Sequence, residues 1–66
     1  MFGANMRQKR KEMGITTAEL AQALCTSEQM VRHYESGFKV PSLATALVIA
    51  KTLHTTVDEL ANNQPT

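Results

Sequence analysis

The chain has 66 residues, of which 42% are hydrophobic and 20% are charged, and its formal net charge is +1. A chain of this length holds one domain with a small core, which excludes a large enclosed active-site pocket. The composition is that of an ordinary globular protein without the apolar run of a membrane span or signal peptide, so we expect a cytoplasmic protein with no membrane partner.

The cysteine and histidine content argues against disulfide or metal chemistry. Cys25 is the only cysteine, so neither an intramolecular disulfide nor a cysteine-based metal set can form. His33 and His54 do not complete a ligand cluster, and we expect no metal and no other cofactor. Cys25 falls in a predicted turn, where we expect a packed structural residue rather than a redox sensor.

The positive charge is concentrated in the first part of the chain. Residues 1–41 carry six basic and four acidic side chains, whereas residues 42–66 carry one basic and two acidic side chains. Arg7, Lys9, Arg10 and Lys11 crowd one short segment. The small net charge therefore conceals a local basic cluster.

The first predicted helix runs from about Asn5 to Met13. Met6, Arg10 and Met13 share one helical face, and Gly14 stands where a left-handed residue closes a helix.

The second predicted helix begins with a capping box. The Thr16 hydroxyl can accept a hydrogen bond from the N–H of Glu19, whose carboxylate can accept one from the N–H of Thr16. Leu20, Ala21 and Leu24 then face inward.

The third predicted helix lies between Ser27, its N-cap, and Gly37, its glycine stop. At about 100° per residue, Val31 and Tyr34 lie on a narrow inward face, and polar side chains fill the wide remaining arc. That arc holds Glu28, Gln29, Arg32, His33 and Ser36. Two helices joined by a tight turn, the second with such a face, describe a helix-turn-helix unit over about residues 17–36.

Two further helices complete the pattern. Ser42 can cap a fourth helix, and Thr56 and Glu59 form a second capping box that begins a fifth. The residues expected to face inward are Leu43, Ala46, Leu47, Ala50 and Leu53 in the fourth helix, and Val57 and Leu60 in the fifth. Since no segment alternates with period two, the predicted fold class is all-α, with one domain over residues 1–61 and a polar tail over residues 62–66.

The polar face of the third helix suits the DNA major groove. Arg32 can donate two hydrogen bonds to guanine O6 and N7, Gln29 can pair with adenine, and Glu28 can accept from a cytosine amino group. His33 can read a base edge or contact phosphate. A polar helical face is more often simply solvated, so this chemistry alone does not establish DNA binding.

Four motifs resemble the XRE family of helix-turn-helix proteins, to which phage Cro and the lambdoid repressor DNA-binding domains belong. They are MRQKRKEMGITTAELAQAL, Tyr34 to Gly37, Pro41 to Leu43, and LHTTVDEL, in this order between about Met6 and Leu60. The resemblance implies a compact five-helix, lambda-repressor-like domain whose second and third helices bind DNA.

The resemblance also implies roles for single residues. Glu28, Gln29 and either Arg32 or His33 match positions that face bases. Thr17 matches a phosphate-contacting position that is usually glutamine in the family, and its shorter side chain cannot brace Gln29 as glutamine would.

Other residues match family positions that lie near DNA phosphates or that stabilise the fold. Ser36 and Lys39 match positions near phosphates. Arg10 and Glu35 match a partly buried salt bridge, so we expect a structural role for Arg10, with phosphate contact secondary. Cys25 and His54 replace glycines common in the family, and we expect both to have positive φ.

The leading functional hypothesis is a sequence-specific transcription regulator, repressor-like, that binds double-stranded DNA as a homodimer on a two-fold operator. Half-site centres would lie roughly 34 Å apart, and the fifth helix and the flank of the fourth that includes Val48 are candidate dimer surfaces. The alternative is a protein-interaction module, such as an antitoxin, that holds an unidentified partner. We expect no enzyme, because Cys25 and His33 lie on a turn and an exposed face without evident oxyanion donors.

Overall fold

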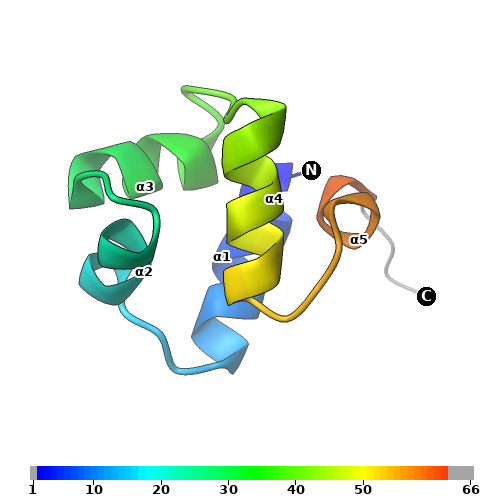
Figure 1. Ribbon diagram of the computed structural model, residues 1–66, viewed down its shortest axis with the longest axis horizontal. Helices are drawn as coiled ribbons and strands as arrows, with labels where there is room; N and C mark the ends of the chain where they lie inside the picture. The colour runs from blue at the N-terminus through cyan, green and yellow to red at the C-terminus, as the bar shows by residue number, and fades with distance from the viewer. Residues whose placement is uncertain (1, 63–66) are drawn as a thin grey trace.

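The computed structural model describes residues 2–62, which form five α-helices and no strand. The helices are α1 (Phe2–Glu12), α2 (Thr17–Ala23), α3 (Glu28–Ser36), α4 (Leu43–Thr52) and α5 (Val57–Ala61). In the view of Figure 1, α2 and α3 lie on one side of α4 and α5 lies on the other. The all-α prediction is confirmed. Within residues 2–62, no helix combines the length and apolarity that crossing a bilayer requires.

Hydroxyl side chains begin the four later helices, as predicted. The N-caps are Thr16, Ser27, Ser42 and Thr56. The first capping box is complete, because the Thr16 hydroxyl accepts from the N–H of Glu19 at 3.0 Å while the Glu19 carboxylate accepts from the N–H of Thr16 at 2.9 Å. The second box is half formed. Thr56 accepts from the N–H of Glu59, but the carboxylate of Glu59 instead accepts a hydrogen bond from the Thr55 hydroxyl.

Left-handed residues follow the first four helices, at the positions where glycine or its replacements were predicted. Gly14 and Gly37 have φ of 71° and 85°, and Cys25 and His54 have φ of 56° and 55°. The positive φ expected at the two non-glycine positions is therefore confirmed. The expectation that Cys25 is packed was wrong, since the residue is exposed in the turn that leaves α2.

One core unites the five helices. Its fully buried side chains come from every helix, and they are Met6, Leu20, Val31, Ile49, Leu53 and Leu60. Phe2, Ile15, Leu24, Tyr34 and Val57 are partly buried and pack against this cluster.

The first helix differs from its predicted bounds at both ends. It begins at Phe2 rather than near Asn5, because the Phe2 side chain packs against the core and this contact stabilises the first turn. It ends at Glu12, one residue early. Met13 therefore leaves the helical face that it was expected to share, and its side chain is 37% exposed.

The inward face of α4 was also predicted incorrectly in part. Ala46, Ala50 and Leu53 are buried as expected, but Leu43 and Leu47 are 70% and 55% exposed. Ile49 is fully buried in their place. Because α4 is apolar around most of its circumference, the sequence offered two apolar stripes, and only the packing against neighbouring helices selects one.

Close contacts hold α1 against both α3 and α5. The Cβ of an alanine at Gly3 would lie within 2.6 Å of the Glu35 carbonyl oxygen, and closer still to that of Tyr34. Glycine therefore permits α1 to approach the end of α3. Two residues later, the Asn5 amide donates to the carbonyl oxygens of Leu60 at 2.7 Å and Asn62 at 2.8 Å, which satisfies acceptors at the end of α5.

Candidate nucleic-acid interface

The packing of α3 decides which of its side chains can meet a ligand. Val31 is fully buried and Tyr34 packs against the core, so the opposite side of α3 faces outward. The exposed polar residues on that side are Glu28, Gln29, Arg32 and Ser36. Figure 1 shows α2 and α3 joined by a short turn at one side of the molecule, which is the predicted helix-turn-helix arrangement.

His33 lies at the margin of this surface. Its side chain is half-buried, and its ring packs on Phe38 with a centroid separation of 4.8 Å and an interplanar angle of 45°. Phe38 is itself 73% exposed. His33 therefore faces the loop between α3 and α4, apart from the more exposed Gln29 and Arg32.

Arg10, on α1, holds α3 in place through Glu35. Its Nε donates to Oε2 of Glu35 at 2.7 Å, and Nη2 donates to Oε1 at 3.3 Å. Its Nη1 donates to the carbonyl oxygen of Ile15 at 2.8 Å, in the turn between α1 and α2. All three guanidinium nitrogens are engaged and the residue is only 8% exposed, so the geometry favours the structural role of Arg10 over phosphate contact.

A second polar cluster joins the starts of α2 and α3. The Thr17 hydroxyl donates to Oε1 of Glu28 at 3.0 Å, and Nη2 of Arg32 donates to the same oxygen at 3.3 Å. Thr17 thus does not reach toward Gln29 and braces Glu28 instead. Sequence reasoning missed this bond because it depends on the angle between two helices.

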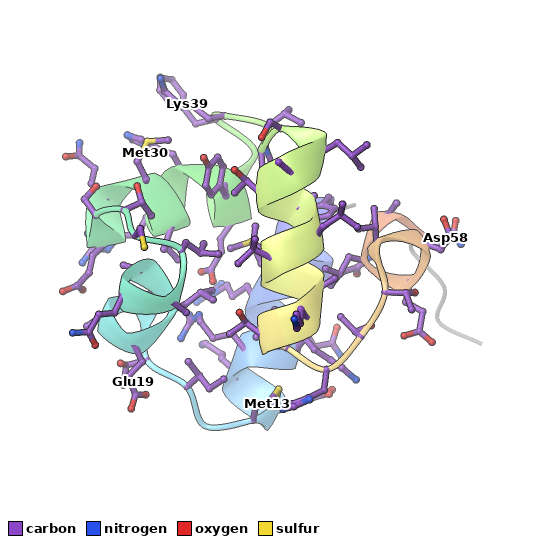
Figure 2. All side chains as sticks on the ribbon, in the orientation of Figure 1. Met13, Glu19, Met30, Lys39 and Asp58 are labelled. Carbon is purple, nitrogen blue, oxygen red and sulfur yellow. The ribbon has the colours of Figure 1, made fainter. Side chains whose placement is uncertain are left out.

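The remaining predicted phosphate contacts lie at the far end of α3. The Ser36 hydroxyl donates to the carbonyl oxygen of His33 at 3.2 Å and accepts from the N–H of Phe38 at 3.3 Å, so it also stabilises the helix end. Lys39 stands in the loop that follows. Figure 2 shows its side chain projecting away from the helices, where its ammonium group is free to reach an anion.

Sequence reasoning also missed Arg7 as a candidate. A surface hollow between α1, α2 and α3 is lined by Arg7, Arg10, Thr17, Arg32, Glu35 and Ser36. Arg7 is exposed, and its guanidinium belongs to the same hollow as that of Arg32, which is paired with Glu28. The available signal was its spacing, since Arg7 lies one turn before Arg10 and Lys11 and so shares their side of α1.

Comparisons with known proteins place these observations in a family. A helix-turn-helix family model, HTH_3, matches residues 6–60. No curated protein matches the sequence.

Solved structures match the whole fold. SinR, the master regulator for biofilm formation, solved in complex with DNA, has a TM-score of 0.84 and 25% identity over 94% of this chain and 100% of that chain. A SinR–SinI protein complex gives a TM-score of 0.85 at 25% identity, over 96% of this chain and 62% of that chain.

Apo-HppE gives a TM-score of 0.82 at 24% identity over 92% of this chain but only 34% of that chain, which is a likeness of fold alone. The family match covers α2, α3 and α4 completely, including the exposed polar face of α3, and most of α1 and α5. The chain therefore belongs to the XRE-type helix-turn-helix family of DNA-binding transcription regulators.

Proposed function

We propose that the chain is a repressor-like, sequence-specific regulator that inserts α3 into the major groove of double-stranded DNA. The observation that carries the proposal is the division of α3 into a face anchored in the core by Val31 and an outward face rich in hydrogen-bonding groups. Helix-turn-helix proteins dock their second helix in this way, with its N-terminal residues toward the bases.

The first turns of α3 would read the bases. Arg32 suits guanine, Gln29 suits adenine, and Glu28 keeps its Oε2 free to accept from a cytosine amino group. His33 is a marginal reader because its ring packs on Phe38.

The surrounding residues would hold the phosphate backbone. Lys39 lies in the loop beyond the C-terminal end of α3. Ser36 and Arg7 line the hollow between α1, α2 and α3. Arg10 is a weaker candidate because its guanidinium is already bonded. The side-chain hydroxyl of Thr17 donates to Glu28, which leaves no proton for a phosphate while that bond persists.

Binding as a homodimer on a two-fold operator would supply the contacts that one small domain lacks. Half-site centres would then lie roughly 34 Å apart along the duplex.

A partner-binding role is the second candidate. Leu43, Leu47 and Val48 form an exposed apolar flank on α4, as suits a protein-protein contact. The similar SinR has been solved with the protein SinI.

The salt dependence of duplex binding separates these functions. A regulator that neutralises four to six phosphates should show log K falling with log salt at a slope of about −4 to −5. A slope near zero, or no duplex binding at moderate salt, would contradict DNA recognition and favour the partner-binding role.

A further inference from the structure

Three side chains from two helices meet at one carboxylate oxygen on the candidate DNA-reading surface. Oε1 of Glu28 accepts hydrogen bonds from Thr17 at 3.0 Å and from Arg32 at 3.3 Å. Thr17 and Glu28 are the first residues of α2 and α3, whereas Arg32 lies one turn further along α3. The cluster therefore couples the orientation of a candidate base-reading side chain to the packing of the helix pair.

The hydrogen-bond inventory limits what Thr17 can do. A threonine hydroxyl has one proton, and here that proton is directed to Glu28. It cannot be donated at the same time to a phosphate oxygen. The Thr17 side chain consequently acts on the DNA through Glu28 rather than by direct donation.

The same inventory leaves Arg32 able to read a base. A guanidinium has five N–H donors, and one of those on Nη2 is directed to Glu28. The remaining donors are sufficient for the bidentate pattern with O6 and N7 of guanine. Because a free arginine side chain has many rotamers, holding it beside α3 reduces the entropy lost when it meets the base.

The negative charge of Glu28 favours contacts with bases over contacts with phosphates. Its carboxylate side chain is 46% exposed and would be repelled by phosphates, which weakens any docking register that places the start of α3 against the backbone. The Arg32 side chain is 61% exposed, and an unpaired guanidinium there would bind phosphates as readily as bases. The ion pair thus disfavours non-specific contact while leaving donors for a correct base.

We propose that Thr17 and Glu28 are positioning residues that make Arg32 selective for a guanine in the operator. The inference rests on the proposed function, since it assumes that α3 enters the major groove. The ligand that this cluster recognises is the O6/N7 edge of one guanine. In addition to the cytosine contact proposed for its Oε2, Glu28 acts in two ways within this cluster, by holding Arg32 and by repelling phosphate.

The test uses Glu28→Gln and Thr17→Val in the full chain, with a site recovered by selection from random duplexes. Affinity is measured for that site, for an unrelated duplex, and for the site with each guanine replaced in turn by 7-deazaguanine, which lacks the N7 acceptor. Thr17→Ser restores the donor, and Thr52→Val, at the end of α4, is the matched hydroxyl-to-methyl control. Thermal unfolding establishes that every variant is folded.

Glu28→Gln should strengthen binding to the unrelated duplex while weakening binding to the selected site, so that their ratio falls by about tenfold. Thr17→Val should lower affinity for the selected site by about threefold and leave unrelated binding unchanged, and Thr17→Ser should restore the loss. One 7-deazaguanine substitution should weaken the wild type yet have no effect on Arg32→Ala. Thr17→Val should likewise have no effect in that background.

Three results would overturn the inference. The first is an unchanged ratio of selected to unrelated affinity in both Glu28→Gln and Thr17→Val. The second is a Thr17→Val effect that persists when Arg32 is absent, which would show that Thr17 contacts DNA itself. The third is a wild-type chain that selects no duplex sequence, which would overturn the proposed function as well; the first two leave that function intact.

Discussion

Arg10 and Glu35 join α1 to α3 through two hydrogen bonds, and their side chains are only 10% and 7% exposed. The same guanidinium holds the turn before α2 through the Ile15 carbonyl oxygen. One side chain therefore connects α1 to α3 and to the turn that leads into α2. Together with the burial of Val31, this pair holds the orientation of α3, on which any base reading depends.

Removal of one partner of this pair should be costly. Arg10→Met leaves the Glu35 carboxylate buried without its cation, and we expect a loss of about 3 to 5 kcal/mol in the free energy of unfolding, measured in urea. Arg10→Met combined with Glu35→Leu should recover much of that loss, because no charge is then left buried. Lys9→Met is the matched control, since Lys9 lies 4.0 Å from Glu12 at the surface and should contribute little. Equal effects of Arg10→Met and Lys9→Met would contradict this reading of the pair.

Gly3→Ala should destabilise the protein although it lies within a helix. Alanine normally stabilises a helix interior by about 0.5 to 1 kcal/mol relative to glycine. Here its Cβ would collide with the carbonyl oxygens at the end of α3, so we expect a net loss of about 1 to 3 kcal/mol in the free energy of unfolding. The sign of the change in unfolding free energy distinguishes the steric clash from the ordinary helix preference for alanine. A higher melting temperature for Gly3→Ala would show that α1 does not approach α3 so closely.

Asn5→Ala should loosen α5. The Asn5 amide donates to two carbonyl oxygens at the end of that helix. Loss of these two hydrogen bonds should lower the free energy of unfolding by about 1 to 2 kcal/mol. Amide hydrogen exchange should accelerate in α5 more than in α2 and α3. Gln8→Ala provides the control on α1, because Gln8 makes only a 3.3 Å bond to exposed Glu12. Uniform acceleration in all helices would argue against a local role for Asn5.

Arg7→Ala and Lys39→Ala should weaken binding to all duplex sequences similarly. Each should lower the magnitude of the salt slope by about one, as expected for the loss of one phosphate contact. Lys51→Ala on α4 is a matched basic control outside the residues that line the hollow. A sequence-dependent effect of Lys39→Ala would mean that Lys39 touches a base edge.

Arg32→Ala should behave differently from the phosphate variants. We expect a cost of about 1 to 3 kcal/mol on the best site and a relaxed preference at one base pair, measured by competition between duplexes that differ at that pair. An equal loss on every duplex would assign Arg32 to the backbone.

Local chemistry made much of this fold predictable from the sequence. The hydroxyl at Thr16 and the glycines at 14 and 37 act on backbone groups within one helical turn, so their effect does not depend on the rest of the chain. The starts of the four later helices followed from their caps, whereas α1 begins three residues before its predicted start. The outward polar side of α3 was equally readable, since Val31 and Tyr34 supply a periodic inward face.

The features that sequence reasoning missed depend on contacts between helices. The helices that pack against α4 determine that Ile49 rather than Leu47 is buried in the core. The need for glycine at position 3 arises only because α1 passes close to the end of α3, which leaves no space for a side chain. The bond from Thr17 to Glu28 likewise spans two helices. Neither hydrophobic periodicity nor spacing reports the relative placement of such elements.

Selection of bound sequences from random duplex DNA tests the central claim most directly. The full chain is incubated with the pool at moderate salt, and bound duplexes are recovered and sequenced. We predict a two-fold motif whose half-site centres lie roughly 34 Å apart, with a guanine in each half that Arg32→Ala no longer requires. A pool that shows no enriched motif after repeated rounds would contradict sequence-specific recognition by α3.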